Sequence, residues 1–340
     1  MALASTPHTW LQPRPDGLYC SAGDFWIDPH GGKERALVTH GHADHARPGH
    51  NHVLATSETL AIMKARYGKA AGDAHQSIGY GEVLSINGVD VSFYPAGHVL
   101  GSAQILLEHE GQRIVVSGDY KRRRDPTCAP FEPIACDVFI TEATFGLPVF
   151  THPDTAEEVA KILAAKAANP ERTILVGAYA LGKCQRVIRH LREAGYDKTI
   201  YLHGAMVALC ELYETLGVSL GPLKQVNLKE MGKLPGEIIL CPPGQLADRW
   251  ARRFADPISA FASGWMRVRQ RAKQRGVELP LIISDHADWN ELTETIEDIS
   301  PGEVWVTHGR EDALVHWCTQ KGIAAQALSL VGRGEDPDES

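Results

Sequence analysis

A dense group of potential metal ligands occupies the segment Thr39-His40-Gly41-His42-Ala43-Asp44-His45. Imidazole nitrogens and carboxylate oxygens suit divalent metals of intermediate hardness, and four such groups fall within six residues. In an extended chain, residues i and i+2 project to the same side. We therefore expect His40 and His42 to bind one metal ion, while Asp44 and His45, after the turn, bind a neighbouring ion.

Two further candidate ligands stand at the ends of predicted strands. His98 lies in the glycine-bracketed turn Pro95-Ala96-Gly97-His98-Val99-Leu100-Gly101-Ser102, and Asp119 follows an apolar strand through Ser117-Gly118. Strand ends are where a scaffold presents side chains to a shared site. A carboxylate can bridge two cations, which a neutral imidazole cannot do, so Asp119 is a candidate bridging ligand.

The elements that position these residues follow from hydrophobic periodicity. Short strands are predicted over 36–38, 89–94, 104–107 and 114–116. From about 153 the pattern alternates, with strands at 173–177, 199–202 and 237–240 followed by helices from Leu181, Ala205 and Gln245. This alternation favours a parallel sheet and a second α/β unit. After about 280, short apolar strands return at 281–283 and 304–306, and the acidic tail is expected to be frayed.

Composition narrows the class of protein. The chain has 340 residues, 44% hydrophobic and 22% charged, which is typical of a folded globular protein. The net charge of −8 argues against binding polyanions over the whole surface, so any nucleic-acid contact must be local. No apolar run has the length of a signal peptide or membrane span, and the seven cysteines contain no C-x-x-C pair. We expect a cytoplasmic protein with no membrane partner.

The order H-x-H-x-D-H, then a Gly-His turn, then a strand-terminal Gly-Asp resembles the metallo-β-lactamase superfamily. The resemblance implies an α/β fold, the metallo-β-lactamase αββα sandwich. It also implies that one metal ion is held by four residues, His40, His42, His98 and Asp119. The second ion would be held by Asp44, His45 and the shared Asp119. Asp28, after Asp24-Phe25-Trp26-Ile27, matches the early aspartate of the superfamily, which orients ligands.

Three later motifs are similar to those of the β-CASP nuclease branch. They are Thr141-Glu142-Ala143-Thr144-Phe145-Gly146, Ser284-Asp285-His286-Ala287-Asp288 and Val306-Thr307-His308-Gly309. The resemblance makes His308 a ligand of the second metal and His286, paired with Glu142, the proton donor. It implies an inserted β-CASP α/β domain at 151–280, a metallo-β-lactamase domain from 1–150 and 281–332, and a tail at 333–340.

Such a site would hydrolyse phosphodiester bonds with two divalent metal ions. Two neighbouring cations activate water and offset the charge that develops on the phosphate. The candidate catalytic residues are Asp44, Asp28, Glu142 and His286. The leaving 3′ oxygen needs a proton, which the imidazolium of His286, paired with Glu142, can supply. The ligand set suits zinc, and manganese or iron are also compatible with it.

The motifs point to two substrate classes. A histidine in the third motif resembles RNA-processing β-CASP enzymes. The segments Gly118-Asp119-Tyr120-Lys121-Arg122 and Asp125-Pro126-Thr127-Cys128 resemble bacterial ligase-associated DNA damage response exonucleases, encoded beside a helicase and an ATP-dependent DNA ligase. We therefore expect a DNA 3′ exonuclease acting on single-stranded or tailed ends in DNA repair. An RNA 3′-end processing ribonuclease, a non-catalytic nucleic-acid-binding scaffold and a small-molecule hydrolase are the alternatives.

Two basic runs are candidates for holding a polyanion. The first, 121–124, follows Asp119, and the second places five cations between Arg267 and Arg275 on a predicted helix. Its alternative is a solvated helix face. A tryptophan could stack a base, and a helix N-terminus could receive a phosphate. The substrate-binding candidates are Lys121, Arg122, Lys183, Trp265, Arg267 and Arg271.

Overall fold

The structure is a computed structural model that describes residues 7–227 and 234–328. The chain divides into two compact units, which we call the sandwich unit (1–151 and 285–340) and the insert unit (152–284). Each unit is described by itself. No helix within the described ranges has the length and apolar character needed to cross a bilayer.

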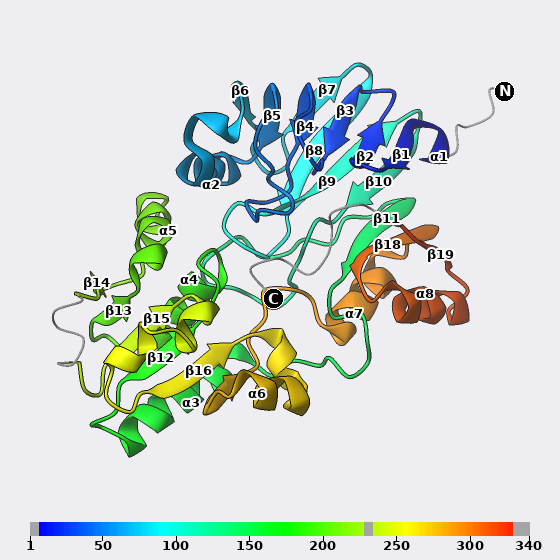
Figure 1. The fold of residues 1–340 in the computed structure, drawn as a ribbon. Helices are drawn as coiled ribbons and strands as arrows, with labels where there is room; N and C mark the ends of the chain where they lie inside the picture. The colour runs from blue at the N-terminus through cyan, green and yellow to red at the C-terminus, as the bar shows by residue number, and fades with distance from the viewer. Residues whose placement is uncertain (1–6, 228–233, 329–340) are drawn as a thin grey trace. The chain divides into compact units, whose positions relative to one another are not determined.

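The sandwich unit contains two sheets (Figure 1). The first sheet has six strands in chain order: β1 (Leu11–Arg14), β2 (Gly17–Cys20), β3 (Phe25–Ile27), β4 (Arg35–Leu37), β5 (His52–Ala55) and β6 (Ala74–Ser77). The second sheet has the order β19-β18-β11-β10-β9-β8-β7. Its strands are β7 (Val83–Ile86), β8 (Val89–Pro95), β9 (Ala103–His109), β10 (Gln112–Val116), β11 (Val138–Ala143), β18 (Glu303–Gly309) and β19 (Ala324–Ala327).

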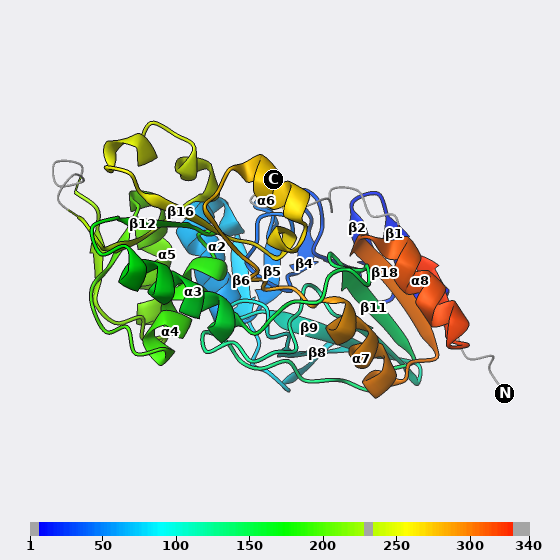
Figure 2. The same cartoon turned by 90° about the horizontal axis from the view of Figure 1, so that it is seen from below.

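Alternating side chains divide the second sheet into two apolar faces. In β10, Ile114 and Val116 join the core between the sheets, whereas Val115 joins a separate cluster on the outer face. This is the period-two pattern of a strand buried on both sides. The outer face is covered by α7 (Trp289–Ile299) and α8 (Glu311–Gln320), as Figure 2 shows. Helix α2 (Ser57–Tyr67) packs on the first sheet in the same way, and the short α1 spans Pro7–Trp10.

The insert unit is built on one six-stranded parallel sheet with the order β14-β13-β15-β12-β16-β17. Its strands are β12 (Ile174–Gly177), β13 (Ile200–Leu202), β14 (Leu223–Gln225), β15 (Ile238–Cys241), β16 (Ile258–Ala262) and β17 (Leu279–Leu281). Its helices are α3 (Thr155–Ala168), α4 (Lys183–Glu193), α5 (Gly204–Thr215) and α6 (Arg269–Arg275). The parallel sheet expected from the strand and helix alternation is present.

Two local predictions were wrong, and one lies outside the described residues. Instead of a helix from Gln245, the chain forms short 3₁₀ turns at Pro243–Leu246 and Ala251–Arg253. The strand expected at 281–283 is β17, which pairs with β16 and so belongs to the insert unit. Periodicity marks an apolar run but does not name its partner. The expected frayed tail at 333–340 falls outside the described residues.

Candidate metal centre and active site

The candidate ligands lie at or just beyond the carboxyl ends of sandwich-unit strands. β10, β11 and β18 are parallel, and β8 is related to β10 through two antiparallel pairings with β9. The carboxyl ends of these four strands therefore meet at the same edge of the second sheet. That edge carries His98, Asp119, Glu142 and His308. The segment 40–45 comes from the first sheet, directly after β4.

Local backbone features direct these side chains. The pairing of β11 with β18 shifts register between Thr141 and Ala143, and such bulges turn a side chain such as that of Glu142. Gly118 has a φ of +56°, and a Cβ added there would lie 2.8 Å from Thr39 Cβ. Only glycine therefore lets the backbone before Asp119 approach so closely.

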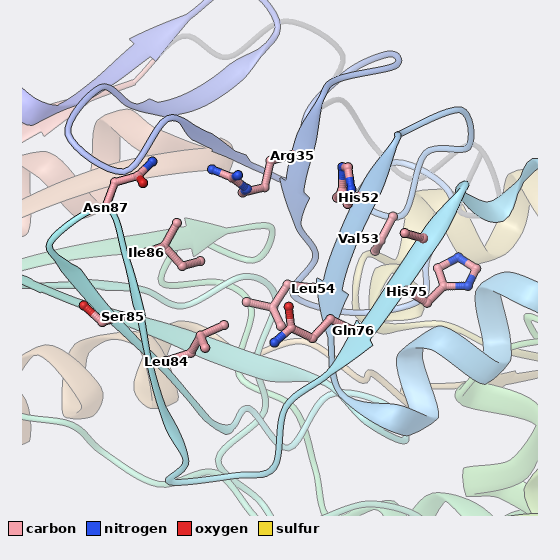
Figure 3. A pocket seen from close by; sticks show the side chains of 11 residues that line it. Arg35, His52, Val53, Leu54, His75, Gln76, Leu84, Ser85, Ile86 and Asn87 are labelled. Atoms are coloured by element: carbon pink, nitrogen blue, oxygen red, sulfur yellow. The ribbon is translucent and has the colours of Figure 1, made fainter.

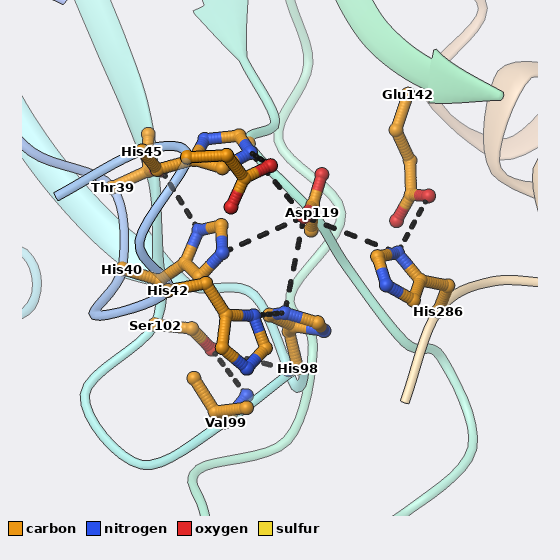
Figure 4. A network of polar contacts seen from close by, with 12 residues as sticks. Thr39, His40, His42, His45, His98, Val99, Ser102, Asp119, Glu142 and His286 are labelled. Atoms are coloured by element: carbon orange, nitrogen blue, oxygen red, sulfur yellow. Dashed lines mark hydrogen bonds and ion pairs between the residues drawn. The ribbon is translucent and has the colours of Figure 1, made fainter. Parts of the chain in front are cut away.

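The first ligand group consists of His40, His42, His98 and Asp119, all buried, with one donor atom of each within 4.8 Å of the others. His40 Nε2 lies 3.5 Å from Asp119 Oδ2, and His98 Nε2 lies 2.9 Å from His42 Nδ1. Figure 4 shows the contacts of the Asp119 carboxylate with His40 and His98, and His42 beside His98. These four residues form a compact nitrogen and oxygen donor set.

The second ligand group consists of Asp44, His45 and His308, which are also buried and meet the same 4.8 Å limit. His45 Nε2 lies 3.4 Å from Asp44 Oδ2 and 3.4 Å from Asp119 Oδ2. His308 adopts the left-handed backbone conformation with a φ of 61°. The same Asp119 oxygen thus contacts imidazoles of both groups, which is the geometry required of a bridging carboxylate.

The donor atoms of the two groups fit divalent metal ions. Five of them are buried without a hydrogen-bond partner: His40 Nε2, Asp44 Oδ2, His45 Nε2, Asp119 Oδ1 and His308 Nδ1. A buried polar atom left unpaired is costly, and native proteins rarely accept several in one place. Coordination to cations would satisfy all five atoms, so the residues present fit a pair of metal ions.

Burial and neighbouring charges keep most of the candidate ligands in the protonation state that metal ions require. Burial, followed by repulsion from neighbouring imidazoles, holds the pKa of His40 and of His98 well below the ordinary value. Burial works against ionisation of Asp119, but the imidazoles of His45 and His308 outweigh it and keep the pKa of this carboxyl well below its usual range. Neutral imidazoles and an ionised carboxylate are the metal-binding forms.

The environment of His45 attracts positive charge. Burial opposes protonation of this imidazole, but the carboxylates of Asp119, Asp44 and Asp28 outweigh burial and raise its pKa well above the ordinary value. A divalent cation supplies the same compensation more effectively than one proton does. Three carboxylates around one imidazole are therefore consistent with a cation site.

Asp28 orients part of this site. Its Oδ2 lies 2.7 Å from His45 Nδ1 and accepts a 2.6 Å hydrogen bond from the Thr39 hydroxyl, while Oδ1 accepts the Thr39 backbone N–H at 2.8 Å. The contact at Nδ1 leaves His45 Nε2 to face Asp44 and Asp119. A carboxylate behind an imidazole ligand sets its tautomer and ring orientation.

His286 and Glu142 form a buried pair beside the ligand groups. His286 Nδ1 lies 2.9 Å from Glu142 Oε2 and 4.0 Å from Asp119 Oδ2 (Figure 4). Glu142 Oε1 accepts a 2.7 Å hydrogen bond from the Tyr120 backbone N–H. The carboxylate is therefore held on both oxygens, and it fixes the orientation of the His286 imidazole next to the candidate metal centre.

Lys121 was expected to contact substrate, but it is buried in an ion pair with Glu291. Its side chain is buried, and its ammonium group donates to Glu291 Oε2 at 2.6 Å and to the His286 carbonyl at 3.0 Å. It is not exposed for a phosphate contact, because Glu291 already neutralises it. Arg122 is half-buried and paired with Asp298 at 2.5 Å. The motif Asp288-x-x-Glu291, a capping box at the start of α7, was the signal that sequence reasoning missed.

Lys183 and Trp265 of the insert unit are also buried. The Lys183 ammonium lies 4.3 Å from the centre of the Tyr179 ring, and its side chain has no exposed surface, so it does not present a free charge to solvent. The Trp265 ring is covered by the Arg271 guanidinium at 4.0 Å, so a base could stack on that face only after Arg271 moved away. Arg267 is exposed and Arg271 is half-buried.

A separate cavity of about 440 Å³ lies between strands β5, β6 and β7 (Figure 3). Leu54, Leu84 and Ile86 form its apolar side, and Arg35 and His52 reach its rim. None of the residues of the two ligand groups lines it. This cavity is therefore distinct from the candidate metal centre.

The chain is similar in sequence to several known proteins. It is 30% identical over 324 residues to an Opitutus terrae protein named "Probable DNA ligase", covering 94% of this chain and 31% of that protein. It is 33% identical over 123 residues to the endoribonuclease ysh1 of Aspergillus fumigatus, covering 35% of this chain and 14% of that protein. These similarities confirm the expected resemblance to nucleases of the β-CASP branch of the metallo-β-lactamase superfamily.

Other comparisons agree with a β-CASP fold. The Drosophila melanogaster cleavage and polyadenylation specificity factor 73 is 31% identical over 127 residues, 37% of this chain and 19% of that protein. A crystal structure of an Enterococcus faecalis V583 protein of unknown function superposes with a TM-score of 0.60 at 14% identity, covering 88% and 81% of the two chains. No family model matches the chain. The αββα sandwich with an inserted β-CASP α/β domain is confirmed as the fold class. The chain spans less than a third of the length of these curated relatives.

Proposed function

We propose that the chain is a metal-dependent nuclease that hydrolyses phosphodiester bonds, acting as a 3′ exonuclease on single-stranded or tailed DNA. The observation that carries the proposal is the position of Asp119 Oδ2. It lies 3.5 Å from His40 Nε2, 3.4 Å from His45 Nε2 and 4.0 Å from His286 Nδ1. One carboxylate oxygen therefore adjoins both candidate metal sites and the candidate proton donor.

The metal ions would be held by seven side chains: His40, His42, His98 and Asp119 in one group and Asp44, His45 and His308, with Asp119 shared, in the other. Two divalent cations bound there would lower the pKa of water and neutralise charge on the scissile phosphate. Zinc fits the nitrogen-rich donor set, and manganese or iron fit its mixture of histidine and aspartate.

Side chains of this chain would supply the proton to the leaving oxygen. Glu142 occupies His286 Nδ1, so the proton for the leaving 3′ oxygen comes from Nε2. The Tyr120 N–H group keeps Glu142 in place, and the backbone carbonyl of His286 is held by Lys121. Asp28 holds His45 in the orientation needed for ligation. Each catalytic candidate thus has a partner that restricts its motion.

We favour DNA over RNA as the substrate, because the similarity that covers 94% of this chain is to a protein named "Probable DNA ligase". An association with an ATP-dependent DNA ligase and a helicase, and a role in DNA repair, belong to the same proposal. An RNA 3′-end processing activity is the second candidate, because the endoribonucleases align over about a third of this chain. A non-catalytic scaffold fits less well, since the complete donor set is buried and assembled.

Helix α6 is the proposed contact for the phosphate backbone. Arg267, Arg269, Lys273 and Arg275 are exposed, and Arg271 lies over the Trp265 ring. A concentrated cationic helix in a chain of net charge −8 can hold a polyanion locally.

The test uses the purified full chain with a DNA and an RNA oligonucleotide of identical sequence, each labelled at its 5′ end. The expected result is stepwise shortening of DNA from the 3′ end, lost on chelation and restored by a divalent cation. The Asp119→Asn variant controls for a contaminating nuclease. Faster cleavage of RNA would favour the second candidate, and metal retention without cleavage of either strand would favour the scaffold.

A further inference from the structure

Two buried cysteines of the insert unit face each other across neighbouring helices. Cys184 lies in the first turn of α4 and Cys210 in the middle of α5, and their Sγ atoms are 3.9 Å apart. A disulfide needs a separation of about 2.05 Å. The remaining gap of roughly 2 Å is within reach of side-chain rotation, because Cys side chains move between staggered rotamers without moving the backbone.

The two thiols are also chemically unlike each other. Hydrogen bonding from Cys184 lowers the pKa of Cys210 despite its burial, and the Gln185 side-chain amide, 3.4 Å from Cys210 Sγ, acts in the same direction. The contact with Cys210 and then burial raise the pKa of Cys184 well above the ordinary value. Cys210 is therefore the candidate nucleophile and Cys184 its partner.

Four of the other five cysteines provide a contrast. Burial raises the pKa of Cys20 and Cys318 to about 11 and that of Cys136 and Cys241 to about 12. Buried thiols of this kind react slowly, because the thiolate is the reactive form. Cys210 should therefore be oxidised before any of these four thiols.

A route for a small oxidant leads to Cys210. This residue lines a cavity of about 630 Å³ in the insert unit, together with Leu202, Val207, Thr215 and Lys224. Cys210 itself has only 1% of its surface exposed, so a bulky reagent cannot approach it easily. A peroxide is small enough to use such a path.

We propose that Cys184 and Cys210 are an oxidation site, at which hydrogen peroxide or another small peroxide forms a reversible disulfide between α4 and α5. In the first step the Cys210 thiolate attacks one peroxide oxygen: an S–O bond forms, the O–O bond breaks and hydroxide leaves. In the second step Cys184 loses its proton to that hydroxide and attacks Cys210 Sγ, so that the S–S bond forms, the S–O bond breaks and a second hydroxide leaves. This hydroxide takes up the proton that the Cys210 thiol released when it ionised. Two thiols and one hydrogen peroxide thus give one disulfide and two waters.

The crosslink would join the start of α4 to α5 between residues separated by 26 positions in the sequence. A disulfide restricts the unfolded chain, so the oxidised insert unit should melt at a higher temperature than the reduced one. This inference does not depend on the nuclease proposal, because neither cysteine belongs to the metal ligand groups.

The experiment treats the purified full chain with limiting hydrogen peroxide, blocks the remaining thiols and maps peptides by mass spectrometry. The expected result is loss of two of the seven thiols, a single 184–210 disulfide, its reversal by dithiothreitol and a higher melting temperature of the oxidised protein. In the Cys184→Ser variant, Cys210 should instead stop at a sulfenic acid, which dimedone traps once the peroxide is removed and the chain is unfolded. The Cys241→Ser variant, altered at a neighbouring buried thiol, should still form the crosslink.

Two outcomes would overturn the proposal. One is oxidation of any other cysteine before Cys210 in protein whose circular dichroism spectrum shows it to be folded. The other is a Cys184→Ser protein that is folded during oxidation and gives no dimedone adduct at Cys210 when it is afterwards unfolded. If Cys184→Ser does not fold, the mapping of the unaltered chain still decides the matter, because a 184–210 disulfide either is or is not the first product.

Discussion

Replacement of Lys121 by methionine tests whether this buried cation supports the fold around the active site. Lys121 and Glu291 side chains are each 4% exposed and their charged atoms are 2.6 Å apart. Burial favours the neutral carboxyl of Glu291, but Lys121 and the backbone N–H groups of Asp288 and Arg123 outweigh it and lower the pKa to about 2. Methionine preserves most of the side-chain volume but removes the charge and the two hydrogen bonds that the ammonium group donates.

The size of the expected loss follows from the shift in pKa. The change from 4.5 to about 2 is about 2.5 units, which at 1.36 kcal/mol per unit corresponds to about 3 kcal/mol. Removing one partner of a buried ion pair typically costs about 3–5 kcal/mol, so the two routes agree. We therefore expect Lys121→Met to lower the free energy of unfolding by about 3 kcal/mol at pH 7.

The pH dependence has a definite sign. A carboxyl group whose folded pKa is depressed contributes stability that is complete above its unfolded pKa, here about 4.5, and is lost as the pH falls through about 2. The stability difference between the unaltered chain and the variant should therefore be full at pH 7 and should shrink between pH 4.5 and pH 2.

The assay is urea denaturation of metal-free protein followed by tryptophan fluorescence, at pH 7 and near pH 3. Lys321→Met is the matched control, because Lys321 also pairs with a glutamate, Glu297, at 2.9 Å, but both side chains are 51% exposed. An exposed pair contributes roughly 0–1 kcal/mol. The reasoning is refuted if Lys121→Met loses no more stability than Lys321→Met, or if its deficit is the same at both pH values.

The remaining predictions concern the site and the substrate. His286→Ala should leave metal content intact while kcat falls by about 10²–10⁴-fold, since a proton donor is lost but no ligand; loss of both metals, measured by mass spectrometry, would contradict this role. Asp119→Asn should reduce the occupancy of both sites together, and two fully occupied sites in that variant would exclude bridging. Arg269→Glu with Lys273→Glu should weaken DNA binding and flatten its dependence on salt, whereas Lys321→Glu should leave both unchanged; an unaltered slope would remove α6 from the binding surface.

Much of the candidate site could be predicted from the sequence, because its signals are local. The ligands of segment 40–45 are neighbours in the chain, and His98 and Asp119 stand at strand ends that hydrophobic alternation reveals. Glu142 and His286 have no such local signal, since 144 positions separate them and only the family resemblance joined them. Their 2.9 Å contact depends on how β11 and the segment before α7 meet.

The basic residues were harder to place. A lysine is expected at the surface unless it is paired. The partner of Lys121 is Glu291, which lies 170 positions away, so no residue near Lys121 in the sequence indicates the pair. Lys183 was expected to be available to a phosphate at a helix start, but it is buried against the Tyr179 ring. The same limit applies to the Cys184–Cys210 contact, which depends on how α4 and α5 are aligned.

The sequence by itself determined the donor types, their order, the sandwich and insert class and the alternation of the parallel sheet. The donor types, their order and the alternation follow from motifs a few residues long and from short-range periodicity, whereas the sandwich and insert class is what the resemblance of those motifs to a known family implies. Only the tertiary structure decided which cations are buried, which oxygen of Asp119 adjoins both ligand groups and which two thiols meet. Burial and pairing arise from contacts between segments far apart in the chain, where the low dielectric makes each unpaired charge costly and so selects its partner.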